Sequence, residues 1–129
     1  MVYANHYLIF TDTMAPIILY LLTLFIVLLL TALIETVALQ LMRWGTFKQC
    51  IRAALVMNLA SLIGWILMLV IVPQFGFAGL LLAILFSTVI EWGVLARMKR
   101  GVAAYNFLAA LAANLASYLI ILLPAFLYS

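Results

Sequence analysis

The stretch IETVALQLMRWGTFKQCIRAALVMNLASLIGWIL, residues 34–67, has a counterpart in IEWGVLARMKRGVAAYNFLAALAANLASYLIILL, residues 90–123. The two stretches align without a gap and are identical at 13 of 34 positions. Shared Leu and Ala are expected in so apolar a chain, but the only two glutamates, Glu35 and Glu91, also align. The chain is therefore predicted to contain one two-helix unit in two copies.

Other uncommon residues align at the same offset. These pairs are Asn58 with Asn114, Ser61 with Ser117 and Gly45 with Gly101. Because each unit contributes an even number of membrane spans, the two copies keep one orientation and are parallel repeats about an axis along the membrane normal. We expect repeat 1 at about 31–68 and repeat 2 at about 87–124.

The composition is typical of a chain whose solvent is lipid. Of the 129 residues, 71% are hydrophobic and only 7% are charged, far from the balance of a soluble domain. A helix needs about 20 apolar residues to cross the hydrocarbon core of a bilayer. Four segments meet this requirement, at about 16–42, 53–72, 77–96 and 102–123. We predict an all-α integral membrane four-helix bundle, built from two parallel helical-hairpin repeats, that forms a single transmembrane domain over residues 1–129.

The ends of the predicted helices carry local signals. Pro16 suits a first helical turn, with Asp12 or Thr13 as the N-cap. The residues before it lack a basic region and a cleavage site, so we expect a short translocated tail in which His6 is a surface residue. The segment PQFGFAG at 73–79 is predicted to be a tight turn between the second and third spans.

The basic residues predict how the chain is oriented in the membrane. All six fall at two connections between spans: Arg43, Lys48, Arg52, Arg97, Lys99 and Arg100. By the positive-inside rule, the loops 43–52 and 97–101 are cytoplasmic. Both termini are then extracytoplasmic, in a multi-pass protein of the cell (inner, or cytoplasmic) membrane.

The buried polar residues are predicted to share one layer of the bundle. Each glutamate precedes its asparagine by the same interval, with the basic connection midway, so an antiparallel hairpin brings the two to similar depth. Residues spaced by three or four lie on one helix face, and small residues beside each asparagine allow close helix packing at the centre of the bundle. The candidate site is a polar intramembrane cluster of Glu35, Asn58, Ser61, Glu91, Asn114 and Ser117.

Two arginines are candidate charge partners for the glutamates. An ionisable group inside a membrane costs at least about 2.5 kcal/mol on insertion scales, so it requires a partner or a purpose. Arg52 and Arg97 lie at corresponding levels of the two hairpins, on opposite helices. We hypothesise that each copy holds a cluster of Glu, Asn and Arg in which the arginine side chain extends inward or to the headgroups.

Three interpretations of the cluster remain open on the sequence. It is a structural staple that sets the register of apolar helices, or Glu35 and Glu91 carry protons or a cation in alternating access. The third interpretation is quinone, pigment or lipid binding in a groove beside Trp65 and Trp92. Against transport, neither glutamate lies near a Gly/Pro break or an unwound segment.

Several function classes are excluded or disfavoured. The single Cys50 cannot form an internal disulfide or a paired redox site. No catalytic arrangement, metal-ligand set or phosphate loop is present, so we expect no enzymatic activity, no metal and no cofactor. Six cations confined to two short loops serve orientation and contact with anionic lipid, so no nucleic-acid partner is expected.

Three families share features with the chain. It resembles small multidrug-resistance transporters in its four spans and the glutamate in the first, but it adds the aligned Glu91 and a strong charge bias. It resembles the proteolipid ring subunits of rotary ATPases in its duplicated hairpin, but their carboxylate lies on the second helix. The pattern of Glu, basic loop and Asn-Leu-x-Ser, over residues 34–61 and 90–117, looks like that of uncharacterised small polytopic membrane proteins, a resemblance that implies no known activity.

The sequence as a whole predicts a small accessory or scaffolding subunit of a larger membrane protein complex, respiratory, photosynthetic or transport. Its expected partners are the lipid bilayer and other membrane subunits. The alternative is a proton- or cation-coupled small transporter that uses Glu35 and Glu91.

Overall fold

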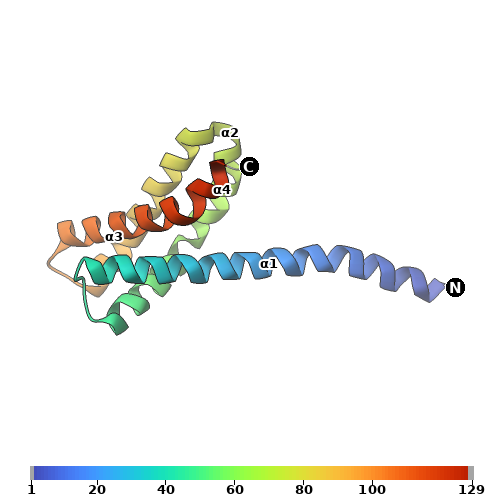
Figure 1. Ribbon diagram of the computed structural model, residues 1–129, viewed down its shortest axis with the longest axis horizontal. Helices are drawn as coiled ribbons and strands as arrows, with labels where there is room; N and C mark the ends of the chain where they lie inside the picture. The colour runs from blue at the N-terminus through green and yellow to red at the C-terminus, as the bar shows by residue number, and fades with distance from the viewer. Residues whose placement is uncertain (1, 128–129) are drawn as a thin grey trace. The chain divides into compact units, whose positions relative to one another are not determined.

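A computed structural model describes the backbone of residues 2–127 and, within it, the side chains of residues 14–64, 66, 70, 74–121, 123, 124 and 127. All of the described secondary structure is helical, in the order α1 (Val2–Leu41), α2 (Phe47–Met98), α3 (Ala103–Ser117), η1 (Tyr118–Leu122) and α4 (Leu123–Leu127) (Figure 1). The chain divides into two units, Met1–Leu30 and Thr31–Ser129. Both predicted repeats fall within the second unit.

Helix α1 begins earlier than the sequence predicts. The expected start at Pro16, with Asp12 or Thr13 as N-cap, is wrong, because the helix begins at Val2 and Pro16 lies inside it. A proline removes one backbone hydrogen bond, and residues 2–15 contain no glycine or second proline that would end the helix. The side chains of the expected tail, including His6, lie outside the described residues.

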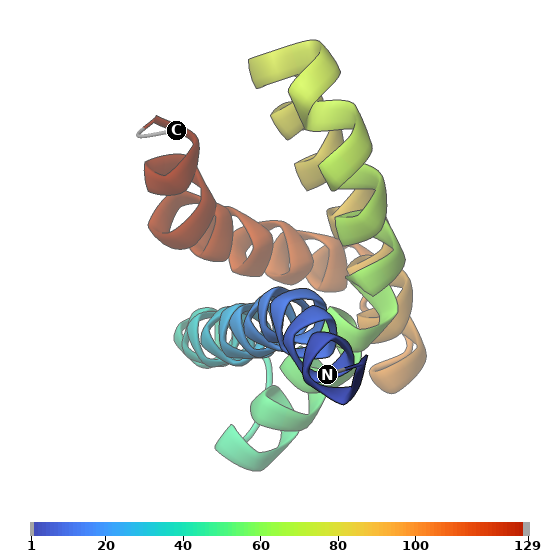
Figure 2. The same ribbon diagram turned by 90° about the vertical axis from the view of Figure 1, so that its right-hand side faces the viewer.

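Helix α2 contains two arms that double back on each other. Gly76 has φ 54° and ψ −129°, a non-helical conformation inside the predicted turn, and glycine adopts it without the steric cost of a Cβ. Figures 1 and 2 show the arm before Gly76 and the arm after it running side by side. A Cβ built on Gly64 would lie 3.2 Å from the Phe86 ring, so the two arms pack closely.

The last expected span, 102–123, is helical from Ala103 onward but changes its hydrogen-bond pattern. Helix α3 passes into the π-helix η1 directly after Ser117, and α4 continues to Leu127. The helix thus ends later than the sequence predicts. A π-helical turn inserted in an α-helix is uncommon and frequently accompanies a functional site, and here it follows a residue of the predicted cluster.

Three described helices are long and apolar enough to cross a membrane, in agreement with a multi-pass membrane protein. They are Met14–Leu41, Gln74–Met98 and Ala103–Ile121. Of the four expected spans, the first, third and fourth overlap these helices. The second, 53–72, has a helical backbone, but several of its side chains lie outside the described residues.

The core of the second unit is built from small side chains. Ala53, Ala109, Ala110 and Ala113 are fully buried and pack with larger residues such as Leu39. Small side chains let helix backbones approach closely, which favours dispersion contacts between helices in lipid. The small-residue helices therefore lie at the centre of the unit, as the sequence predicts.

The two basic connections are tied to each other. The Trp44 indole donates to Asn106 Oδ1 at 2.9 Å, and Lys99 Nζ donates to the Trp44 carbonyl at 2.7 Å. The Tyr105 hydroxyl donates to the Met42 carbonyl. These bonds fix the ends of the helices and with them the register of the side chains deeper in the unit.

Candidate functional site

The first half of the site joins α1 to the first arm of α2. Asn58 Nδ2 donates to Glu35 Oε2 at 2.5 Å and to the Ala54 carbonyl at 2.9 Å. The Thr31 hydroxyl donates to Asn58 Oδ1 at 2.8 Å. Because one amide bonds a carboxyl, a backbone carbonyl and a hydroxyl, the Asn58 side chain is held in a single orientation.

The second half of the site joins the second arm of α2 to α3. Asn114 Nδ2 donates to Glu91 Oε2 and, at 3.2 Å, to the Ala110 carbonyl. Each of these contacts corresponds to one in the first half at the offset of the sequence repeat. The structure thus brings each glutamate to the asparagine that the sequence places level with it.

The two serines cross between the halves. The Ser117 hydroxyl lies 3.2 Å from Glu35 Oε1 and 3.0 Å from the Asn114 carbonyl. The Ser61 hydroxyl lies 3.4 Å from the Asn58 carbonyl and also bonds the Glu91 side chain. Each serine therefore connects its own asparagine to the glutamate of the other half, a pairing that the sequence analysis did not predict.

All six predicted cluster residues lie together and away from the surface. Their side chains are between 1% and 5% exposed. The Glu35 and Glu91 carboxyl groups are near enough to interact electrostatically. Bonds to amides and hydroxyls satisfy these polar atoms, as burial in a medium without water requires.

Arg52 and Arg97 do not join the cluster. Both side chains are exposed, and the residues that the structure describes form no ion pair between either arginine and Glu35 or Glu91. The hypothesis of a Glu, Asn and Arg cluster is corrected accordingly: the amides take the place of the cations. An arginine at a helix end reaches the solvent or headgroups at lower cost than a buried position.

Three hydroxyl groups near the cluster were missed. Thr31 bonds Asn58, whereas Ser87, at the corresponding position of the second half, pairs with the Tyr118 hydroxyl at 3.2 Å. Thr88 is fully buried, and its Oγ1 has no hydrogen-bond partner among the described residues. The sequence signal for Thr31 and Ser87 is that both positions carry a hydroxyl at the repeat offset.

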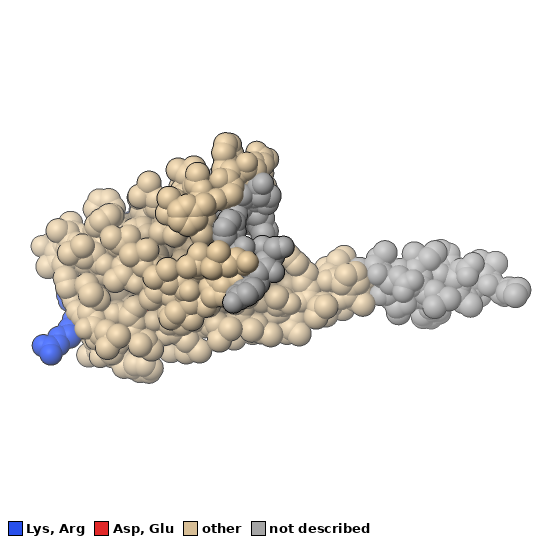
Figure 3. Space-filling view, turned by 45° about the horizontal axis from the view of Figure 1, so that its top comes forward, with Lys and Arg blue, Asp and Glu red and all other residues tan. Residues whose placement is uncertain are grey.

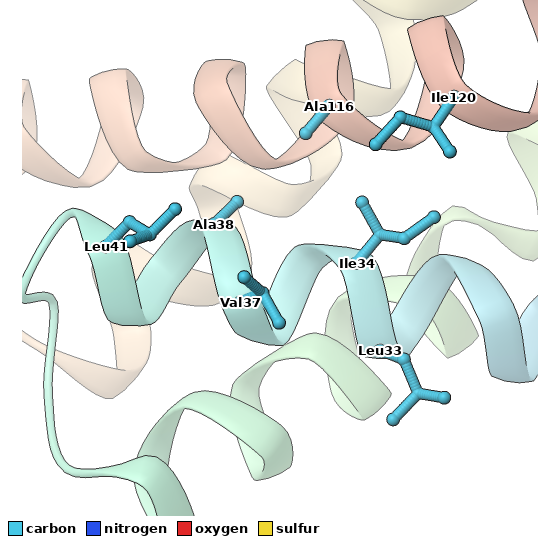
Figure 4. A pocket seen from close by; sticks show the side chains of 7 residues that line it. All are labelled: Leu33, Ile34, Val37, Ala38, Leu41, Ala116 and Ile120. Atoms are coloured by element: carbon cyan, nitrogen blue, oxygen red, sulfur yellow. The ribbon is translucent and has the colours of Figure 1, made fainter.

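An apolar groove lies outside the cluster, between α1 and the helix formed by α3 and η1. Its volume is about 350 Å³, and Figure 4 shows side chains from the two helices facing each other across it. The lining residues are Leu33, Ile34, Val37, Ala38, Leu41, Ala116 and Ile120. This lining suits a hydrocarbon chain or an apolar side chain.

The described residues offer little covalent chemistry. Among them, no group of three or more His, Cys, Asp or Glu side chains is placed to hold a metal ion. Cys50 is fully buried and contacts the Gly45 carbonyl at 3.7 Å. Burial raises the pKa of the Cys50 thiol, so the nucleophilic thiolate is disfavoured.

Comparison with known proteins finds no matching protein family, no similar curated protein and no similar solved structure.

Proposed function

We propose that the protein is a small accessory or scaffolding subunit of a larger membrane protein complex. The observation that supports this proposal is that the polar cluster is sealed from its surroundings. Its six polar side chains bond one another and are at most 5% exposed. A polar layer of this kind fixes the register of the helices and leaves their outer surfaces apolar. Those surfaces are then free to contact other membrane subunits.

The cluster also supports a duplicated hairpin. Glu35 with Asn58 and Glu91 with Asn114 make the same contact, and the serine contacts are exchanged between the halves. We infer two parallel repeats in the cell membrane, with the loops 43–52 and 97–101 cytoplasmic and both termini outside. Lys48→Cys and Gln74→Cys, each introduced in a Cys50→Ala chain, should then react with impermeant maleimide from opposite sides of the membrane. Labelling of both from one side would contradict this topology.

The groove is the surface that we assign to a partner subunit. Its side chains are apolar, and Ala38 and Ala116 leave room between the helices for a bulky side chain of a partner's transmembrane helix. Packing of large side chains against small residues is a main source of helix association in lipid. The partner is therefore expected to present a large aliphatic or aromatic residue here.

A filling substitution tests this assignment. Ala116→Phe should occupy the groove and abolish co-purification of partner subunits after cross-linking in native membranes. Ala78→Phe is the matched control, because Ala78 is exposed on α2 and does not line the groove. Retention of the same partners by both variants would contradict the assignment.

A second candidate function, proton- or cation-coupled transport, is favoured by one detail of the cluster. The Ser117 hydroxyl has one proton and two acceptors within 3.2 Å. A proton on Glu35 would let the carboxyl group donate to Ser117, whose own proton would then bond Asn114. The same exchange at Glu91 and Ser61 would give the layer two coupled proton sites.

Paired glutamine variants separate the two functions. Glu35→Gln with Glu91→Gln keeps an oxygen acceptor for each asparagine but removes ionisation. The scaffold proposal predicts that this variant still assembles with its partners and that parent vesicles show no proton-coupled flux. Flux in the parent that is lost in an intact, assembled glutamine variant would instead establish the transporter.

A further inference from the structure

The basic connections enclose a pocket that neither the cluster nor the groove uses. Its volume is about 280 Å³. The lining residues are Trp44, Gln49, Arg52, Met98 and Lys99. Two cations from opposite ends of α2 thus meet at one cavity, beside an indole and a thioether.

Local contacts hold two of the pocket's donors in place. Gln49 Oε1 accepts from the Thr46 backbone N–H at 2.9 Å in a capping box, which leaves the Gln49 amide NH2 as a donor. A Cβ on Gly45 would lie 2.8 Å from that oxygen, so the glycine makes room for this arrangement. Lys99 Nζ donates one of its three N–H groups to the Trp44 carbonyl and lies 5.6 Å from the centre of the Trp44 ring, so two N–H groups are left for a ligand.

The third donor is Arg52. Its side chain is exposed, and the part of the chain that the structure describes gives its guanidinium no acceptor. All six basic residues of the chain are exposed, and both glutamates are buried inside the unit. Figure 3 shows the basic atoms of the face in view gathered in one place, with no acidic atom beside them. Among the side chains that the structure describes, no carboxylate beside the pocket offsets its positive charge.

The position of the pocket indicates the ligand. The apolar spans end at Leu41 and Met98. The pocket is lined by Met98, by Trp44 and Lys99 just beyond these ends, and by Gln49 and Arg52 on the first turns of α2. In a bilayer this is the level of the lipid phosphates, where lysine, arginine and tryptophan side chains meet headgroups. Met98 and the Trp44 ring add an apolar wall, which a lipid glycerol and upper acyl chain contact and a free phosphate ion does not need.

We propose that this pocket binds the phosphate headgroup of one anionic phospholipid. Arg52 and Lys99 contact the phosphate oxygens, the Gln49 amide donates a further bond, and Met98 packs against the lipid backbone. Charge-assisted bonds from guanidinium and ammonium groups are the strongest available to a phosphate. The site goes beyond the scaffold function and does not depend on it.

The test measures lipid retention by the full chain. The purified protein is delipidated in neutral detergent, given phosphatidylglycerol or phosphatidylcholine, and examined by native mass spectrometry. We expect one phosphatidylglycerol to be retained by the parent and phosphatidylcholine to be retained about tenfold less, because its choline ammonium brings a further positive charge next to Arg52 and Lys99 although its phosphate is the same. Equal retention of the two lipids by the parent would overturn the proposal.

The matched variants are Arg52→Gln and Lys48→Gln. Both remove one charge from an exposed side chain on the first turns of α2, but only Arg52 lines the pocket. Arg52→Gln should lower phosphatidylglycerol retention about tenfold, and Lys48→Gln should leave it unchanged. An equal loss of phosphatidylglycerol retention in the two variants would show that lipid is attracted by the overall positive charge, and would overturn the proposal of a specific pocket.

Two further measurements exclude misfolding of the variant and binding of free phosphate as explanations. Arg52→Gln should unfold at the parent's temperature in lipid-free detergent, since Arg52 has no acceptor in the described structure. Inorganic phosphate should neither stabilise the parent nor displace the bound lipid. Stabilisation by inorganic phosphate equal to that by phosphatidylglycerol would overturn the lipid as the ligand.

Discussion

The two glutamate sites of the cluster make the same contacts to asparagine and serine. They differ in the surrounding hydroxyl groups of Thr31, Ser87 and Thr88, which we call the outer ring. Glu35 and Glu91 each accept from an asparagine of their own half and bond a serine of the other half. Beyond these contacts, Thr31 supports Asn58, whereas Ser87 turns to Tyr118 and Thr88 finds no partner among the described residues. The contacts common to both sites are those that hold the four helical segments in register, and the outer ring varies around them.

The largest effects are expected from loss of the shared amide contact. Asn58→Leu and Asn114→Leu should each lower the free energy of unfolding by about 1–2 kcal/mol, because each leaves a buried carboxyl group without its donor. Unfolding in mixed micelles with increasing denaturing detergent measures the effect. The external control is Gln74→Leu, at an exposed position. If Asn58→Leu changed the free energy of unfolding no more than that control does, the amide contact would not stabilise the fold.

The next largest effect is a difference in stability between hydroxyl substitutions at the two glutamate sites. Thr31→Val should cost about 1 kcal/mol, because Asn58 loses a buried donor. Thr88→Val should cost nothing or raise the stability, because it replaces a buried hydroxyl that has no partner among the described residues by a methyl group of similar shape. The same unfolding assay compares the two isosteric changes. Equal destabilisation by both would show that the second site has an outer ring equivalent to the first.

The smallest effect concerns the crossing serines. Ser61→Ala and Ser117→Ala should each cost about 0.6 kcal/mol, the average for a side-chain hydrogen bond within a membrane protein. A double-mutant cycle should couple Ser117 to Glu35, of the other half, and not to Glu91. Leucine is the partner substitution at each glutamate, because it removes both carboxyl oxygens, whereas glutamine would keep a hydrogen-bonding partner for the serine. Coupling of Ser117 to Glu91 alone would contradict the exchange of serines between halves.

Much of the site could be predicted because it depends on spacing along the chain. Glu35 and Asn58 lie at similar distances on either side of a short connection, so an antiparallel hairpin brings them level, and Glu91 and Asn114 repeat the spacing. The prediction that the arginines pair with the glutamates is wrong because sequence spacing gives the depth of a residue along the helix axis. It does not give the side of the helix on which the side chain lies. Arg52 reaches the surface at no structural cost, so nothing draws its charge inward.

The helix ends and the exchange of serines required the folded chain. Pro16 is an N-terminal signal by itself, yet the helix continues through it to Val2, because one lost hydrogen bond does not outweigh an otherwise favourable run of residues. Ser61 and Ser117 each bond the glutamate of the other half. Which helix face turns to which neighbour is decided by packing of the whole unit, and local pattern does not encode it.

The sequence by itself determined the helical class, the apolar spans and the pairing of each glutamate with its own asparagine. These follow from hydropathy and from distance along the chain, which are local properties. Only the tertiary structure decided that amides in place of arginines satisfy the carboxyl groups, that the halves exchange serines, and that Arg52 and Lys99 meet at one pocket. Those outcomes depend on helix rotation and on contacts between segments far apart in the chain, where the need to satisfy every buried polar atom selects one arrangement.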